Sequence, residues 1–157
     1  MLKFHYYYEF KVENMFRYIK SKTSVLFIVL VSVFISANVS AEVGNLSNAQ
    51  MKQLMTENVP VIDIRTPDEW QSTGIVHGSQ LITFFDARGN FDLDKWLAAL
   101  DKIAHKNDKF ILICRSGNRT QQISNYLDKK LGYTQVYHLK KGIKNWIKSG
   151  DKVVSVQ

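Results

Sequence analysis

Cys114 is the only cysteine of the 157-residue chain, and it lies where an apolar strand passes into a helix. The apolar run 110–113 precedes it, and the polar stretch 115–119 follows it before a helix-forming sequence. A cysteine in this place faces backbone N–H groups and the positive end of a helix dipole. We therefore expect the thiolate form of Cys114 to be stabilised and reactive.

A single cysteine narrows the possible chemistry. It forms no intramolecular disulfide, and Gly117 stands where the second residue of a Cys-x-x-Cys pair would be. The histidines His5, His77 and His105, with His138, are scattered and give no zinc-ligand spacing. We expect no metal and no cofactor, and a nucleophilic role for Cys114. The alternatives are a small buried apolar side chain and an intermolecular disulfide.

The spacing between Cys114 and the second arginine of the loop, Arg119, distinguishes two possible chemistries. Cysteine phosphatases have one residue more between Cys and Arg than the four that separate Cys114 from Arg119. A shorter loop suits a smaller group, such as a single transferred sulfur atom. The spacing therefore favours sulfur transfer over phosphate-ester cleavage.

Four segments, taken in order, resemble the rhodanese-like domain family, and in particular its small secreted thiosulfate sulfurtransferases. They cover most of the chain after residue 45. The segments are 61–70 with its Asp-x-Arg, the Gly-rich turn 74–79, the loop 114–120 and the closing segment 139–146. Two positions depart from the family pattern, because Ile75 replaces a histidine and Lys141 replaces a glycine. Neither departure touches the cysteine loop.

The resemblance implies a sulfurtransferase that carries sulfane sulfur as a persulfide on Cys114. The thiolate attacks a small anionic donor such as thiosulfate, and a thiophilic acceptor then removes the sulfur. Backbone N–H groups of the loop are expected to hold the persulfide. The expected substrate-binding residues are Arg115, Ser116, Gly117, Asn118 and Arg119.

Several of these residues carry a more specific expectation. Arg115 and Arg119 are candidates to bind donor oxygens, although Arg119 could instead fix the loop by bonding backbone carbonyls. Gly117 is expected to adopt a backbone angle that other residues avoid. Asp63 and Arg65 are expected to form a buried pair that orients the loop from a neighbouring strand.

A second hypothesis uses the same loop differently. The domain could be a persulfide carrier or a redox-sensing module with little turnover on small donors. Catalytic turnover with thiosulfate, as opposed to stoichiometric sulfur loading, separates the two.

The N-terminal segment resembles an export signal. Residues 24–37 are almost entirely apolar, follow Arg17, Lys20 and Lys22, and precede small residues ending at Ala41. We expect a signal peptide in residues 1–41 and a periplasmic or secreted domain of residues 42–157. The alternative is an uncleaved membrane anchor that faces outside the cytoplasm. Residues 1–14 are unlike a signal start, and Met15 is a second possible start site.

The charge balance suits an anionic small molecule. The chain has 21 basic and 14 acidic residues and a formal net charge of +7. After residue 41 the lysines are spread among acidic residues, which is unlike a nucleic-acid-binding stripe. We expect no nucleic-acid partner, no stable membrane association once the signal is cleaved, and a monomer.

Strand-like and helix-like stretches alternate along the chain, which predicts an α/β fold. Such folds have a central parallel sheet covered by helices on both faces, and ligands bind at the carboxyl ends of the strands. The resemblance adds a single rhodanese-like domain. The expected strands are 59–64, 81–83, 110–113 and 135–139, and the expected helices are 47–57, 67–70, 91–104, 118–131 and 143–148.

Overall fold

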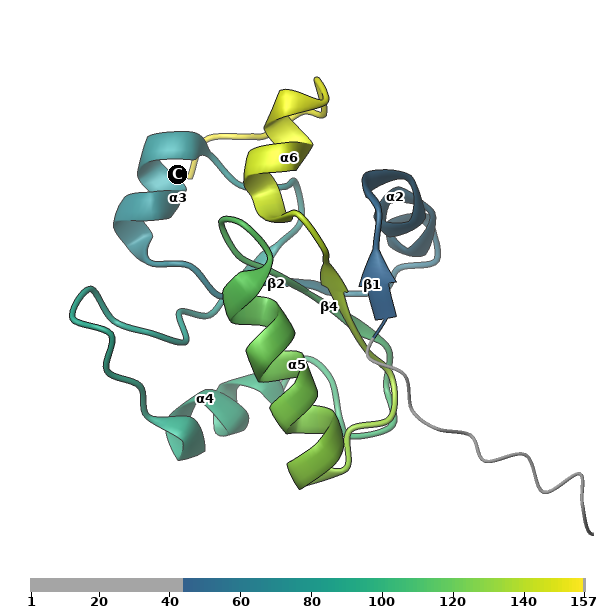
Figure 1. The fold of residues 1–157 in the computed structure, drawn as a ribbon, viewed down its shortest axis with the longest axis vertical. Coiled ribbons are helices and arrows are strands. Elements are labelled where there is room, and N and C mark those ends of the chain that lie inside the picture. Colours follow the sequence, from purple (N-terminus) through teal and green to yellow (C-terminus); the bar gives the residue numbers. More distant parts are fainter. Residues whose placement is uncertain (1–43, 157) are drawn as a thin grey trace, which may run out of the picture. The chain divides into compact units, whose positions relative to one another are not determined.

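The computed structural model describes residues 44–156, which form a parallel five-stranded sheet with helices on both faces (Figure 1). The strand order is β1-β5-β4-β2-β3, and every neighbouring pair runs parallel. The predicted α/β fold is confirmed. The strands are β1 (Gly44–Leu46), β2 (Val61–Asp63), β3 (Gln80–Leu81), β4 (Phe110–Ile113) and β5 (Val136–Leu139).

Helix boundaries follow local capping chemistry. The helices are α2 (Asn48–Thr56), α3 (Pro67–Thr73), α4 (Leu93–Leu100), α5 (Asn118–Leu131) and α6 (Gly142–Lys148). Ser47 and Gln50 form a capping box at the start of α2, and Thr66 and Glu69 form another at the start of α3. Helix α5 ends at Gly132, as the sequence predicted.

Two apolar cores lie on opposite faces of the sheet, because successive side chains of a strand point to opposite sides. From β4, Phe110 and Leu112 pack in the same core as residues of α4 and α5. Ile111 and Ile113 pack in the other core, with residues of α2 and α6. Cys114 belongs to the first core, so its side chain lies on the face of α4 and α5.

Several elements differ from the sequence expectation. Helix α3 extends to Thr73 beyond the expected 67–70, and β2 covers only Val61–Asp63 of the expected 59–64. Strand β1 was not predicted, because its three residues show no apolar alternation and are recognised only by their pairing with β5. The helix expected over 91–104 spans only Leu93–Leu100, since the Asp92 side chain accepts a hydrogen bond from the Lys95 N–H and sets the first turn. The strand expected over 81–83 pairs with β2 only at Gln80–Leu81.

The expected signal peptide of residues 1–41 lies outside the described residues. Within residues 44–156, no helix has the length and apolar character needed to cross a bilayer. The same part of the chain holds no group of His, Cys, Asp or Glu side chains placed to bind a metal ion.

Candidate active site

Cys114 directly follows β4, and α5 begins four residues later. The backbone N–H of Gly117 donates a hydrogen bond to the Cys114 Sγ at 3.1 Å. The Thr120 Oγ1 lies 3.5 Å from the same sulfur. The sulfur thus accepts one backbone N–H at the start of α5 and has one hydroxyl within reach, and the donated N–H favours negative charge on it.

Gly117 lets the loop turn tightly toward the sulfur. Its φ is +93°, in the left-handed region that other residues rarely adopt, which confirms the sequence expectation. A Cβ atom at this position would lie 2.0 Å from the carbonyl oxygen of Lys140. Any side chain here would push the loop away from the turn between β5 and α6.

The start of α6 holds the other side of the loop. The Ile143 N–H donates to the Cys114 carbonyl at 2.9 Å, and the Lys144 N–H donates to the Arg115 carbonyl at 3.1 Å. Gly142 permits this approach, because a Cβ there would lie 2.5 Å from the Cys114 carbonyl oxygen. Two consecutive loop carbonyls are thus fixed by a helix N-terminus.

Arg119 forms a bidentate ion pair with Glu69 of α3. Its Nη1 donates to Glu69 Oε2 at 2.9 Å, and its Nη2 donates to Glu69 Oε1 at 2.7 Å. The two hydrogen bonds to Glu69 are the main reason that the pKa of Arg119 is raised, against burial, with a smaller contribution from Cys114. Arg119 thus fixes the loop to α3 through a carboxylate, rather than through the backbone carbonyls that the sequence suggested.

Glu69 is held in place by this pair and by its own helix. Burial works to raise the pKa of Glu69, but the hydrogen bonds from Arg119 and from the Thr66 N–H outweigh it, and the pKa is lowered. The sequence alone did not link Glu69 to the loop.

Asp63 and Arg65 form the predicted buried ion pair, with Arg65 Nη2 2.7 Å from Asp63 Oδ2. Arg65 also donates to the Glu69 carbonyl, the Thr73 hydroxyl and the Gly74 carbonyl. These acceptors belong to α3 or directly follow it. The pair therefore braces α3 against the sheet, and its link to the loop runs through Glu69.

The remaining predicted loop residues, Arg115, Ser116 and Asn118, are exposed around the buried Cys114. Arg115 lines a pocket of about 360 Å³ between α3 and α6. Lys144 lines the same pocket, and Ile143 and Ile147 provide apolar wall. Glu69 also lines this hollow, which thus combines charged groups and apolar surface next to the Cys114 loop.

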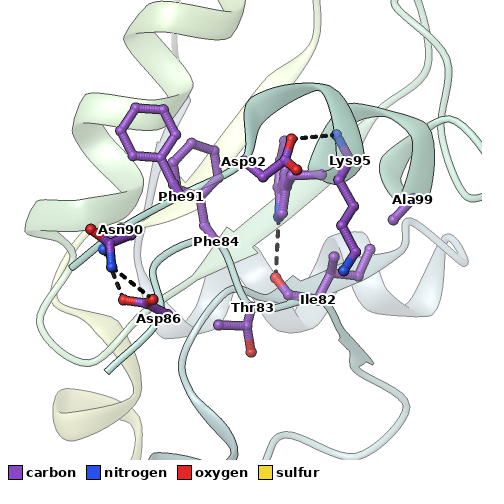
Figure 2. Close-up of a pocket in the computed structure, with 10 residues that line it drawn as sticks. Ile82, Thr83, Phe84, Asp86, Asn90, Phe91, Asp92, Lys95 and Ala99 are labelled. Atoms are coloured by element: carbon purple, nitrogen blue, oxygen red, sulfur yellow. Dashed lines mark hydrogen bonds between the residues drawn. The ribbon is translucent and has the colours of Figure 1, made fainter. Parts of the chain in front are cut away.

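A second pocket, of about 400 Å³, lies between the segment after β3 and α4 (Figure 2). Phe84 and Phe91 stack there with ring centroids 5.3 Å apart, and the carboxylates of Asp86 and Asp92 lie around them. Because its two carboxylates outnumber the single cation of Lys95, this hollow is less suited to an anion than the pocket beside Arg115.

His138 is a neighbour of the loop that the sequence did not reveal. Its Nδ1 lies 3.3 Å from Thr120 Oγ1, and the ring is 1 % exposed. Burial is the main reason that the pKa of His138 is lowered, partly offset by the adjacent Leu139 backbone, so burial favours the neutral ring. No local signal could have identified it, because the face on which residue 138 lies follows from the register of β5 against β4.

Comparison with known proteins supports the family resemblance. The profile of the rhodanese-like domain family matches residues 47–149. An uncharacterized protein of Rickettsia conorii is 29 % identical over 92 residues, which are 57 % of this chain and 72 % of that protein.

Solved structures share the fold. The rhodanese-like domain protein of Staphylococcus aureus superposes with a TM-score of 0.54 at 20 % identity, over 73 % of this chain and 99 % of that chain. The polysulfide-sulfur transferase of Wolinella succinogenes, a homodimer, gives a TM-score of 0.56 at 19 % identity, over 87 % and 93 % of the two chains. With the family profile covering most of the described residues, the chain belongs to the rhodanese-like domain family.

Proposed function

We propose that this protein is a sulfurtransferase that carries sulfane sulfur on Cys114, with thiosulfate or a similar anion as donor. The observation that carries the proposal is the hydrogen bond that the Gly117 N–H, at the start of α5, donates to the Cys114 sulfur. The fold shared with the polysulfide-sulfur transferase of Wolinella succinogenes supports the same reaction class.

The reaction has two displacement steps. The Cys114 thiolate attacks the outer sulfur of thiosulfate, the sulfur–sulfur bond of the donor breaks, and sulfite leaves with the bonding electron pair. The acceptor nucleophile then attacks the outer sulfur of the Cys114 persulfide, and the Cys114 sulfur leaves as a thiolate. Dividing the transfer into two displacements is covalent catalysis, and no electrons are gained or lost overall.

Each proposed loop residue has a defined part in these steps. The Gly117 N–H, which already bonds the Cys114 sulfur, and the exposed neighbours Ser116 and Asn118 are proposed to receive the incoming sulfur. Arg119, held by Glu69, offsets the negative charge of the sulfur from one side. Arg115 offers its guanidinium to the donor oxygens, because a planar fork of N–H groups matches an oxyanion.

The donor is expected to approach over the α3–α6 side of the loop. Arg115 and Lys144 line the pocket there and attract an anion, and the one carboxylate in its lining, that of Glu69, is paired with Arg119. The aromatic pocket has two carboxylates, Asp86 and Asp92, and one cation, Lys95. Cys114 has no exposed surface, so the donor must pass between the exposed loop side chains.

Replacing Cys114 with serine tests the assignment, because this cysteine is the chain's only thiol. We expect Cys114→Ser to keep the fold and to lose thiocyanate formation from thiosulfate and cyanide. Circular dichroism of both proteins controls for folding. Thiocyanate formation by the folded variant at the rate of the unmodified protein would refute the role of Cys114.

The same assay separates the alternative of a persulfide carrier. In that case thiosulfate adds one sulfur atom to the protein, seen by intact-mass measurement, without catalytic thiocyanate formation. This alternative is retained because the buried sulfur limits access by small molecules.

A further inference from the structure

We infer that His138 is a positioning residue that directs the Thr120 hydroxyl toward the Cys114 sulfur. The inference rests on the proposed function of Cys114 and adds a second hydrogen-bond donor to the sulfur, besides the Gly117 N–H. It gives a role to a buried histidine that the transfer steps do not otherwise use.

The sheet register brings the three side chains together. His138 of β5 is paired with Leu112 of β4, and Cys114 lies two residues after Leu112 on the same face. Thr120, in the first turn of α5, lies over that face. Its Oγ1 is 3.5 Å from the Cys114 Sγ and 3.3 Å from the His138 Nδ1, and all three residues are buried.

The Thr120 hydroxyl has one proton and three possible acceptors. The nearest is the Gly117 carbonyl at 2.9 Å, which also accepts the Gln121 N–H at 3.0 Å. The other two are the Cys114 sulfur and, if it lacks a proton, the His138 Nδ1. A bare Nδ1 would compete with the sulfur for the proton.

The other tautomer of His138 removes this competition. A proton on Nδ1 makes the imidazole a donor to Thr120 Oγ1, which occupies a lone pair and leaves the hydroxyl proton free. Once the sulfur is a thiolate, a hydrogen bond to it is charge-assisted and stronger than one to a carbonyl. The hydroxyl then turns to the sulfur.

The other ring nitrogen of His138, Nε2, is evidence against a purely structural role for this residue. Among the described residues, the buried His138 Nε2 has no hydrogen-bond partner. An unpaired buried polar atom is destabilising, and a leucine would fill a similar volume without it. Burial also favours the neutral ring, the state in which Nδ1 and Nε2 share a single proton.

Substitutions at both positions test the inference. His138→Leu removes the donor, whereas His138→Asn keeps a side-chain N–H near the place of Nδ1. Thr120→Val removes the hydroxyl, whereas Thr120→Ser keeps it. We expect His138→Leu and Thr120→Val each to slow persulfide formation from thiosulfate roughly tenfold, the size expected for one hydrogen bond to a charged group.

The conservative variants and the double variant decide between positioning and packing. We expect His138→Asn and Thr120→Ser to keep most of the rate. We expect His138→Leu combined with Thr120→Val to be no slower than either alone, because the two residues act as one unit. Unchanged rates in His138→Leu, or losses that multiply in the double variant, would overturn the inference.

A readout without any sulfur donor separates this inference from the proposed function. Thiolate absorbance at neutral pH, measured as the difference from Cys114→Ser, is expected to fall in His138→Leu and Thr120→Val and to be retained in the conservative variants. If the unmodified protein forms no persulfide, the proposed function fails, yet this absorbance still tests the hydrogen-bond chain. Equal thiolate absorbance in all variants would refute the inference by itself.

Discussion

Two arginine–carboxylate pairs contact α3, and they differ in exposure. In the pair of Arg65 with Asp63, the side chains are 1 % and 0 % exposed. In the pair of Arg119 with Glu69, they are 29 % and 25 % exposed. Both pairs have bonds of 2.7 Å, so distance does not distinguish them.

The difference in exposure assigns the pairs to different tasks. Burying an ion pair completely costs a large desolvation free energy. The remaining N–H groups of Arg65 donate to the Thr73 hydroxyl and to the carbonyls of Glu69 and Gly74. Removing one partner would leave a bare charge in the interior. The pair of Arg119 with Glu69 is partly hydrated, so removing one partner would leave no fully buried, unpaired charge. This pair lies beside the Cys114 sulfur. We therefore expect the first pair to serve the fold and, under the proposed function, the second pair to serve the reaction at Cys114.

Breaking the buried pair is expected to have the largest effect on stability. Arg65→Leu leaves Asp63 charged and unpaired in the core, which is expected to lower the free energy of unfolding by about 3–5 kcal/mol. Urea denaturation measures it. Arg88→Ala is the matched control, because Arg88 is 86 % exposed and 3.9 Å from its carboxylate. A loss below about 1 kcal/mol in Arg65→Leu, as expected for a surface pair, would erase the contrast between the two pairs.

Breaking the partly exposed pair is expected to act on the reaction instead. Arg119→Leu removes a cation beside the Cys114 sulfur, and we expect the rate of persulfide formation to fall roughly tenfold or more. The free energy of unfolding should fall by only about 1 kcal/mol. Arg119→Lys keeps the charge without the bidentate fork, and we expect an intermediate rate. Stopped-flow kinetics with thiosulfate give the rates.

The opposite pattern would contradict the assignment. If Arg119→Leu destabilised the protein as much as Arg65→Leu while the folded fraction transferred sulfur at the original rate, both pairs would be structural.

Local signals in the sequence were sufficient for part of this arrangement. The apolar run of β4 and the Gly132 stop of α5 predicted the limits of both elements correctly. Because Cys114 lies between them, its place at a strand end followed. These features depend on neighbours in the chain, which a single sequence displays directly.

Contacts between distant segments could not be predicted in the same way. Glu69 and Arg119 are 50 positions apart, and many other acidic residues were equal candidates. His138 meets Thr120 only because β5 pairs with β4 in one register, which also fixes the face of the sheet it shares with Cys114. Strand β1 likewise depends on its partner, since three residues alone carry no pattern. Register and packing are properties of the whole sheet.

The smallest expected effect concerns how the stability contributed by the partly exposed pair of Arg119 with Glu69 depends on pH. The pKa of Glu69 is lowered from its usual 4.5, so the carboxylate binds protons less readily in the folded than in the unfolded protein. Its stabilising contribution is complete above about pH 4.5 and is lost as the pH falls through the lower folded value. Solvent screening limits that contribution to about 1 kcal/mol or less.

Glu69→Gln is therefore expected to be less stable than the unmodified protein at neutral pH and to approach it in acid. Urea denaturation across this range measures the difference. Asp68→Asn is the matched control, because it removes a carboxylate from the same helix turn without touching Arg119 and should change stability by only a few tenths of a kcal/mol. A difference for Glu69→Gln that persists undiminished well below pH 4.5 would show that Glu69 acts through packing, and the contrast between the two pairs would then rest on burial alone.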